Sequence, residues 1–451
     1  MRKGENDIEK YMEQLSEYLE NGDFKSIRDM LSELSDDEIA ELLDKTGNAE
    51  NIAKILISLD SELAADVIML LYPELRSKVV KYIPATEIVK FIENLPSDDA
   101  ADLVSELEDE QIPEILEKLP QDYRAEIEEL ISHPEESAGA IMAHEVESLP
   151  GNYSVAQAIA DLVRFGNDIE EIFQIFITDD DGKLLGAMPI QRLLVSSPAS
   201  KLSDIADKVE VVVPIDSDRE FVADLFRRKD LVSAPVVDKD NKLIGRITID
   251  DVLDVVDEEA SEDLYKIVGI VGEEEEDTSI HNIKRRIPWL LIAFVGELIS
   301  GLVLKSFSNT LRRVILLTSF IPLIMALGGN VGTQSATVMI RRIALSRWGH
   351  YHHGKAILKE IVAGMLLGIF TGILLFSLGF VWGDIRVGLI AGIAIFAAMS
   401  VSSIVGSNVP VLLSKFGADP AFGAGPFITT FNDVIGLAIY LGIATVLLNW
   451  F

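Results

Sequence analysis

Five long apolar segments occupy the C-terminal part of this chain and set the environment in which it can fold. They cover residues 287–306, 314–340, 357–381, 387–413 and 422–449. A helix needs roughly 20 mostly apolar residues to cross a bilayer. The pattern therefore predicts a five-helix transmembrane α domain over residues 284–451.

Charge divides the chain in the same place. The formal net charge is −34, yet residues 281–451 carry five acids against thirteen bases, and residues 1–280 carry 68 acids against 26 bases. An asymmetry of this size indicates one part among membrane lipids and a second, acidic part in water. Because an acidic surface repels phosphate groups, we expect no nucleic-acid partner.

The basic residues also predict an orientation. If the N-terminus is cytosolic, nine lysines and arginines flank the inner ends of the five segments and four flank the outer ends. This bias follows the positive-inside rule. The first seven residues contain no apolar signal segment. We expect a multi-pass protein of the cell membrane with its N-terminus cytosolic and its C-terminus outside.

Asp433 lies within the last apolar segment, where an ionised acid costs several kcal/mol unless it faces water or a cation. Two other segments contain clusters of glycine, asparagine, serine and threonine, at 327–337 and 400–410. Helix packing alone can explain such small residues. Together with Asp433 they predict a pathway lined by oxygen ligands, which suit Mg²⁺, Ca²⁺ or Mn²⁺. Mg²⁺ keeps several waters and needs only one or two carboxylates, so it fits this lining well.

Glu297 is a second acid within an apolar segment. It has two interpretations: it lines the same pathway, or it pairs with a base where helices pack.

Residues 1–132 are expected to form short helices. Prolines at 73, 84, 96 and 120 separate apolar stripes of helical spacing. Repeated helix–turn units of this kind predict an all-α superhelical domain.

Residues 133–256 contain an internal repeat. Residues 177–186 match residues 236–245 at an offset of 59, and each copy predicts a strand, a turn and a second strand with helices on either side. The order resembles a tandem pair of cystathionine-β-synthase-type (CBS) motifs in an α/β domain. That resemblance implies an adenine-nucleotide site, such as one for ATP, held by Thr248 and Asp251 of the second copy. The first copy has Met188-Pro-Ile-Gln191 there and lacks the acid, and a purely structural pair is the alternative.

Acids are spaced to share helix faces at two places in the soluble part. Asp98 and Asp102 are four residues apart, and Asp251 and Asp254 are three apart. Further acids follow on a long linking helix expected over residues 257–283. A solvated face explains any one acid, but the set beside a cation pathway indicates a cation sensor.

Three motifs extend the resemblance over the whole chain. They are His133-Pro-Glu-Glu-Ser-Ala-Gly139, Gly328-Gly-Asn-Val-Gly-Thr-Gln-Ser-Ala-Thr337 and Thr430-Phe-Asn-Asp433. With the domain order, they resemble the MgtE family of Mg²⁺ transporters. The resemblance implies a homodimer with an Mg²⁺-selective, channel-like pore.

The family resemblance also implies two sets of metal-binding residues. The pore set is Asp433, Asn330, Gly328, Gly329 and Thr429. The regulatory set is Asp98, Asp102, Glu220, Asp230, Asp251, Asp254, Glu259, Glu262 and Asp263. Mg²⁺ bound to the regulatory set would screen the acids and close the pore, and falling cytosolic Mg²⁺ would open it.

Three alternatives remain open at this point. The chain could carry another divalent cation such as Mn²⁺ or Co²⁺, or exchange cations against Na⁺ or H⁺. It could instead be a membrane-anchored CBS sensor that conducts nothing. An enzyme is not expected, because the sequence contains neither a His-Glu-x-x-His zinc motif nor a Gly-x-x-x-x-Gly-Lys phosphate loop.

Overall fold

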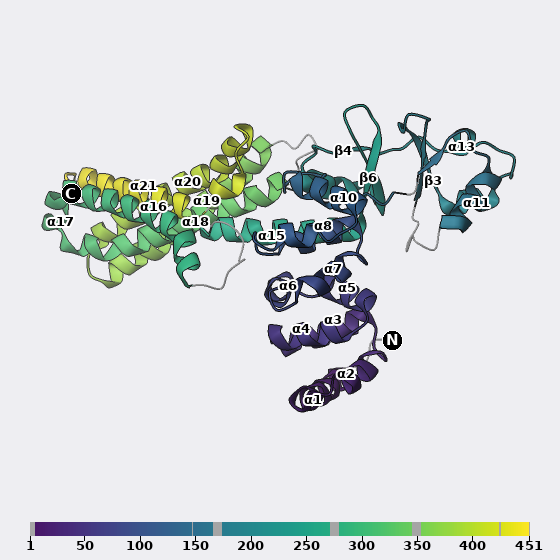
Figure 1. The fold of residues 1–451 in the computed structure, drawn as a ribbon. Helices are drawn as coiled ribbons and strands as arrows, with labels where there is room; N and C mark the ends of the chain where they lie inside the picture. Colours follow the sequence, from purple (N-terminus) through teal and green to yellow (C-terminus); the bar gives the residue numbers. More distant parts are fainter. Residues whose placement is uncertain are drawn as a thin grey trace. The chain divides into compact units, whose positions relative to one another are not determined.

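The computed structural model describes residues 5–146, 148–165, 174–270, 279–344, 353–423 and 425–450. The chain forms two compact units, Met1–Glu259 and Ala260–Phe451. Figure 1 shows the elements of each unit in chain order. Each unit is described by itself below.

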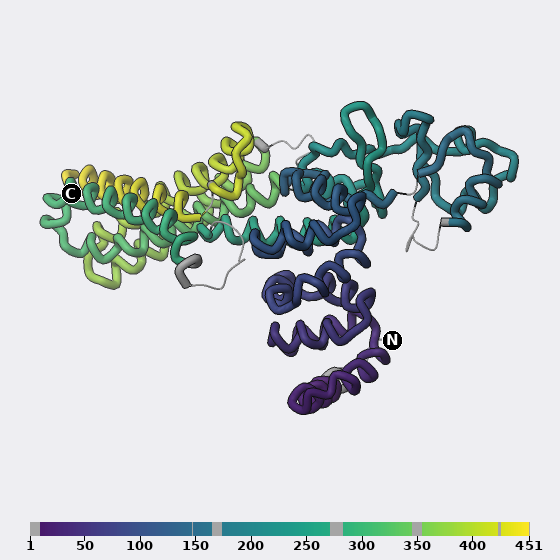
Figure 2. Tube along the Cα trace, viewed as in Figure 1, coloured from purple at the N-terminus to yellow at the C-terminus, as the bar shows by residue number. Residues whose placement is uncertain are grey.

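The first unit begins with a stack of short helices. These are α1 (Glu5–Asn21), α2 (Phe24–Leu31), α3 (Asp36–Thr46), α4 (Ala49–Ser58), α5 (Ser61–Met69), α6 (Pro73–Val80), α7 (Ala85–Ile92), α8 (Ser97–Ser105), α9 (Ile112–Leu116) and α10 (Gln121–Ser132). Helices two apart in sequence contact one another, as in α2 with α4, α3 with α5 and α5 with α7. The purple and blue turns of Figure 2 show this stacking. The predicted all-α superhelical domain is confirmed.

Prolines mark the starts of these helices. Pro73 is the first residue of α6, and Pro84, Pro96 and Pro120 are the N-caps of α7, α8 and α10. Proline fits a helix start because the first amide groups of a helix have no intrahelical partner. The proline spacing in the sequence therefore predicted these helix boundaries correctly.

Two three-stranded sheets follow. The first contains β1 (Ser148–Pro150), β2 (Gln174–Thr178) and β3 (Leu184–Pro189), and the second contains β4 (Val213–Pro214), β5 (Ser233–Val237) and β6 (Leu243–Thr248). In each sheet the first strand runs parallel to the second, and the third is antiparallel to it. The helices of this region are α11 (Val155–Phe165), α12 (Ile190–Val195), α13 (Leu202–Ile205) and α14 (Arg219–Lys229). The predicted CBS pair is confirmed.

The two sheets have the same register. Ile177 pairs with Gly186 and Val236 with Gly245, and each sheet has its irregularity directly after that pair. The turns between the hairpin strands also correspond, since Gly182 and Asn241 are 59 residues apart and have φ of 82° and 64°. The interior of a tight turn often needs this left-handed backbone. The repeat seen in the sequence is thus a repeat in geometry.

The register corrects one detail of the sequence comparison. Gln174 pairs with Pro189 and Ser233 with Thr248, so Thr248 corresponds to Pro189 rather than to Met188. Asp251 then corresponds to Arg192. The first copy therefore has a base where the second copy has an acid.

The apolar cores of the first unit are unequal. One core extends from the N-terminal helices into the second CBS copy and includes Leu15, Phe91, Val104, Val236 and Val255. The first CBS copy has a separate core around Ile175 and Met188. Helix α8 thus packs in the same apolar core as the second CBS copy, and this packing positions the acids of α8.

The second unit begins within α15 (Ile249–Val268) and is helical. It contains α16 (Ser279–Ser306), α17 (Ser308–Arg313), η2 (Ile315–Phe320), α18 (Ile321–Ala344), α19 (His353–Val381), α20 (Ile385–Lys415), η3 (Pro420–Gly423) and α21 (Gly425–Leu448). Among the described residues, five helical segments are long and apolar enough to cross a membrane: Ile283–Ser306, Ile315–Ala344, Gly354–Val381, Ile385–Lys415 and Pro420–Leu448. The five-helix prediction is confirmed.

Glycines bring the membrane helices into close contact. A Cβ atom on Gly406 of α20 would lie 2.2 Å from the carbonyl oxygen of Gly332 on α18. A Cβ atom on Gly392 would lie 2.7 Å from the carbonyl oxygen of Gly372 on α19. Small residues allow backbones to approach in this way where no hydrophobic force between helices exists.

Candidate cation sites

Asp433 lies on α21 with 9% of its surface exposed. Its Oδ1 is 3.8 Å from the position a Cβ atom would take on Gly329 of α18, and Thr429, one turn earlier, adjoins the same glycine at 3.6 Å. The structure therefore brings together three of the predicted pore residues. Because Gly329 has no side chain, the space beside this carboxylate stays open.

The other two predicted pore residues point elsewhere. A Cβ atom on Gly328 would face the hydroxyl of Ser402 on α20 at 3.7 Å. Asn330 lies on the exposed surface of α18. The family resemblance implied one site for all three consecutive residues, but consecutive residues on a helix point about 100° apart.

Asp98 and Asp102 of α8 lie with Asp251, in the first turn of α15, in an acidic cluster in which Asp98 is buried, Asp251 is half-buried and Asp102 is exposed. Burial raises the pKa of Asp98 to about 8, and the charges of Asp99, Glu145 and Asp102 add to this rise. Burial likewise raises the pKa of Asp251 to about 8, with the Asp98 charge as the next cause. Like charges held out of water favour the protonated acid. The cluster can therefore exchange protons for a divalent cation near neutral pH.

Asp99 belongs to the same cluster although the sequence did not single it out. The pKa values of Asp99 and Asp102 are raised to about 7. Desolvation is the largest cause, and the charge of Asp251 contributes to the rise of both. The Arg76 guanidinium opposes the rise for both acids. The i and i+4 spacing drew attention to Asp98 and Asp102 and not to Asp99. Asp99 nevertheless interacts electrostatically with Asp251.

The N-terminus of α8 is fixed by hydrogen bonds within the first unit. The backbone amide and hydroxyl of Ser97 donate to Glu145 at 3.1 Å and 2.7 Å. The Ser97 hydroxyl accepts a bond from the backbone amide of His144 at 2.8 Å. These bonds hold the first turn of α8 in place, and with it Asp98.

Thr248 and Asp251, the predicted nucleotide-binding pair, bond to each other. The Thr248 backbone amide and hydroxyl both donate to the Asp251 carboxylate, at 3.0 Å and 2.7 Å. Asp251 therefore takes part in both the acidic cluster and the predicted ribose site.

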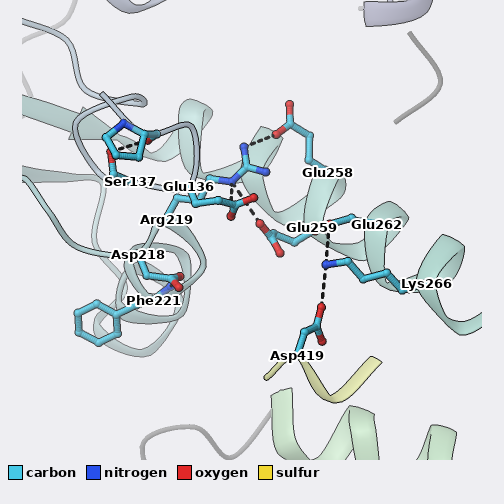
Figure 3. A network of polar contacts seen from close by, with 11 residues as sticks. Glu136, Ser137, Asp218, Arg219, Phe221, Glu258, Glu259, Glu262, Lys266 and Asp419 are labelled. Atoms are coloured by element: carbon cyan, nitrogen blue, oxygen red, sulfur yellow. Dashed lines mark hydrogen bonds and ion pairs between the residues drawn. The ribbon is translucent and has the colours of Figure 1, made fainter. Parts of the chain in front are cut away.

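Arg219 gathers three glutamates around one guanidinium group. It lies 2.8 Å from Glu258, 3.2 Å from Glu259 and 3.5 Å from Glu136, and its side chain is 9% exposed. Figure 3 shows the three carboxylates around it. Glu259, which was predicted as a metal ligand, is therefore paired with the positive charge of Arg219. Nothing in the sequence pointed to Arg219, because it comes from α14, far from α15 in the chain.

A second ion-pair group lies in the second unit. The Lys266 ammonium group is 2.5 Å from Glu262 and 2.7 Å from Asp419, as Figure 3 shows. It also lies 5.7 Å from the ring centroid of Phe422. Burial raises the pKa of the predicted ligand Asp263, and the neighbouring charge of Asp419 adds to the rise. Asp419 lies far from α15 in the chain, and nothing in the sequence indicated this contact.

The remaining predicted acids are dispersed. Burial raises the pKa of Asp254. The charge of Arg76 opposes this rise, and the charges of Asp250 and Asp257 add to it. Glu220 lies in the first turn of α14, and Asp230 is the C-cap of the same helix. Ten residues of helix span about 15 Å, so one cation cannot bind both.

Three family models match parts of the chain. Residues 321–443 match MgtE, a divalent cation transporter, residues 37–136 match the MgtE intracellular N domain, and residues 202–258 match the CBS domain. These matches fall within the membrane part and the helical stack, and on the second CBS copy.

Whole-chain relatives and solved structures agree with these matches. The chain is 33% identical over 328 residues to the magnesium transporter MgtE of Enterococcus faecalis, covering 72% of each chain. It is 32% identical over 329 residues to that of Thermus thermophilus, covering 72% of this chain and 73% of the relative.

Two crystal structures resemble the soluble part. One is the cytosolic domain of the Mg²⁺ channel MgtE in complex with ATP, with 31% identity, a TM-score of 0.51, and coverage of 54% of this chain and 99% of that one. The other is the soluble part of a magnesium transporter, with 26% identity, a TM-score of 0.50, and coverage of 56% and 99%. With its domains, its five apolar helices and these relatives, the chain belongs to the MgtE family of divalent cation transporters and is a membrane protein.

Proposed function

We propose that this chain carries Mg²⁺ through a channel-type pathway beside Asp433, and that cytosolic Mg²⁺ bound to its acidic part closes the pathway. One observation carries the proposal: a carboxylate on a membrane-spanning helix faces a glycine surface of α18. A carboxylate at membrane depth is costly unless it meets water or a cation. The names of the relatives point to Mg²⁺.

The ligand chemistry supports a hydrated divalent cation. Asp433 provides one carboxylate and Thr429 a hydroxyl, and the glycines of α18 leave room beside them. Mg²⁺ dehydrates reluctantly, so a site of this kind binds the ion through its waters. A homodimer would provide two copies of Asp433 along one pathway.

Closure follows from the acids that lie together on α8 and in the first turn of α15. In the absence of a cation, Asp98, Asp102 and Asp251 must hold protons or repel one another. Mg²⁺ displaces those protons and binds the acids while they are together. A ligand shifts a conformational equilibrium only by its difference in affinity for the two states. We propose that Mg²⁺ binds more tightly to the state in which α8 and α15 lie close together.

The other expectations from the sequence enter the proposal unchanged. We place a helical domain at residues 1–132, the CBS pair at 133–256, a linking helix and linker at 257–283, and the pore domain at 284–451. Residues 271–278 of the linker lie outside the described residues. The proposal includes a cytosolic N-terminus, an external C-terminus and one ATP-type site per chain at Thr248 and Asp251. The ATP complex of the similar cytosolic domain supports that site.

Exposed apolar side chains support the homodimer. In the first CBS copy, Val163, Leu194 and Val195 are 77%, 73% and 85% exposed. Exposed large apolar side chains favour contact with another apolar surface. A second copy of the chain is the partner we propose for them.

Uptake into proteoliposomes that contain only this protein tests the proposal. The wild-type chain should take up Mg²⁺ with the Na⁺ and H⁺ gradients collapsed, and Asp433→Asn should abolish uptake. Asp384→Asn is a matched control, because Asp384 caps α20 by accepting from the Arg386 and Val387 amides and asparagine caps equally well.

Each alternative gives a distinct result in this assay. Uptake that stops when a Na⁺ or H⁺ gradient is removed indicates exchange. Faster uptake of Mn²⁺ or Co²⁺ than of Mg²⁺ indicates another cargo. A protein that passes no divalent cation at all is a sensor, and the transport proposal is then wrong.

A further inference from the structure

Helices α16 and α21 touch at a point where no side chain can fit between them. A Cβ atom on Gly296 would lie 1.6 Å from Cγ2 of Thr430. Both residues are within segments able to cross a membrane. The backbone of α16 is therefore held against the face of α21 that carries residue 430 and, one turn on, Asp433.

This contact places Glu297 beside Asp433. Glu297 directly follows Gly296, and its carboxyl group is a hydrogen-bonding and electrostatic neighbour of the Asp433 carboxyl group. Two carboxylates side by side repel each other unless a proton or a cation lies between them. The partner of Glu297 in this contact is thus an acid, whereas one of the two interpretations from the sequence paired it with a base.

The surface of α16 at Glu297 needs water or a cation. Glu297 is exposed on the single chain, whereas Asp433 beside it is buried. An exposed carboxylate on a membrane-spanning helix costs several kcal/mol against lipid. The face of α16 that carries Glu297 is therefore suited to line the ion pathway.

An unpartnered amide gives independent evidence of a ligand at this place. Asn432, next to Asp433, is 2% exposed, and among the described residues neither its Oδ1 nor its Nδ2 has a hydrogen-bond partner. Its Nδ2 is 1.9 Å from the position a Cβ atom would take on Gly332, three residues after the Gly329 that adjoins Asp433. Both side chains thus meet one glycine face of α18. A buried amide without a partner destabilises the fold, and a bound water of a hydrated ion would supply that partner.

We infer that Glu297 is a second carboxylate of the ion site, shared with Asp433 across the contact of α16 and α21, with Asn432 receiving a water of the hydrated cation. The site then offers two acids per chain instead of one. The inference rests on the proposed transport function and adds a residue that determines affinity. The number of charged ligands tunes the affinity of a site for a divalent cation.

Mg²⁺ uptake by the full-length protein in proteoliposomes, measured over a range of Mg²⁺ concentrations, tests the inference. Glu297→Gln should raise the KM for Mg²⁺ by about tenfold, with a smaller change in maximal rate. Glu297→Asp keeps the charge and should recover much of the affinity. Glu360→Gln is the matched control, because Glu360 is also an acid on a spanning helix but pairs with Arg342 at 3.5 Å.

The outcomes separate this inference from the proposed function. An unchanged KM in Glu297→Gln, with Asp433→Asn inactive, overturns the inference and leaves transport in place. A wild-type protein without uptake overturns the proposed function itself. If Glu297→Gln does not assemble, as judged by size-exclusion chromatography in detergent, the KM of Glu297→Ala decides, because alanine also removes the charge: a raised KM supports the inference, and a KM equal to that of wild type contradicts it.

Discussion

The ammonium group of Lys266 lies 2.7 Å from the carboxylate of Asp419, which joins the last turn of α15 to the segment that leads into α21. The backbones meet at the same place. A Cβ atom on Gly425 would lie 2.3 Å from the carbonyl oxygen of Ile267, and one on Gly269 would lie 2.7 Å from the ring of Pro426. The end of α15 and the start of the helix that carries Asp433 are therefore in direct contact.

Replacing Lys266 with methionine should weaken this contact and make closure by Mg²⁺ harder. A partly exposed ion pair contributes about 0.5–1 kcal/mol, so the Mg²⁺ concentration for half-closure should rise about twofold to fivefold. Patch-clamp recording with varied cytosolic Mg²⁺ measures it. Lys415→Met changes an exposed lysine in the last turn of α20 and should have no effect. An unchanged midpoint in Lys266→Met would show that the ion pair has no part in gating.

The acidic cluster predicts a pH dependence of stability when no divalent cation is present. The pKa values of Asp98, Asp102 and Asp251 are raised in the folded protein to about 8, 7 and 8. Between the unfolded value near 4 and these values, the folded state binds more protons than the unfolded state. Stability should therefore fall as pH rises from about 4 to 8 and level off above that range.

Thermal unfolding of the detergent-solubilised protein in EDTA, followed by circular dichroism, measures this dependence. Mg²⁺ should flatten the decline at neutral pH, because it replaces the displaced protons. The variant with Asp98, Asp102 and Asp251 changed to asparagine should lose most of the pH dependence and the response to Mg²⁺. An equally steep decline in that variant would show that other groups cause it.

Arg219 acts as a built-in cation for three glutamates. Replacing it with methionine leaves the carboxylates of Glu136, Glu258 and Glu259 close together. Removing one partner of a fully buried pair costs about 3–5 kcal/mol, and since two of these acids are well exposed we expect about 2 kcal/mol. The loss should be larger in EDTA than in Mg²⁺, because the ion can replace the guanidinium.

Arg228→Met is the control for this experiment. Arg228 is on the same helix and pairs with Asp224 at 2.7 Å, and its side chain is 36% exposed. Its removal should cost less than about 1 kcal/mol and should not depend on Mg²⁺. Equal Mg²⁺ dependence in the two variants would contradict the role given to Arg219.

Glycine contacts between membrane helices predict a sharp difference between two alanine variants. Gly406→Ala would put a methyl group 2.2 Å from the backbone of Gly332, which cannot move aside without separating α18 from α20. Gly442 of α21 has no atom within 4 Å of its Cβ position in the described chain. Gly406→Ala should reduce the yield of folded protein severalfold on size-exclusion chromatography, and Gly442→Ala should not. Equal yields would show that the helices have another way to pack.

The parts of the fold that the sequence predicted depend on local properties. Apolar length determines whether a helix can span a membrane, and the five spanning helices followed from it. Proline lacks an amide hydrogen, so Pro73, Pro84, Pro96 and Pro120 marked helix starts. The CBS repeat followed from an offset of 59 residues.

The parts of the sites that the sequence missed depend on contacts between distant elements. Helical spacing showed that Asp98 and Asp102 share a face, but not that Asp99 also reaches Asp251. Nothing in α14 indicated that Arg219 would meet Glu258 and Glu259. Pairing of this kind arises from tertiary packing, which a single sequence does not specify.

The membrane site shows the same division. Asp433 was identifiable because an acid in an apolar segment is rare. Glu297 was equally visible, but the sequence left open whether it lines the pathway or pairs with a base. Only the packing of Gly296 on Thr430 decides that the partner is Asp433.

Arg192 stands in the first CBS copy where Asp251 stands in the second. The two matching positions of the repeat thus carry opposite charges, and the basic one pairs with Asp207 at 2.5 Å. Each chain then contributes one binding event at this position, and its two repeats cannot cooperate with each other there. Under the proposed mechanism, steepness in the response at this position arises between separate chains, so the dose dependence of closure reports on assembly as much as on affinity.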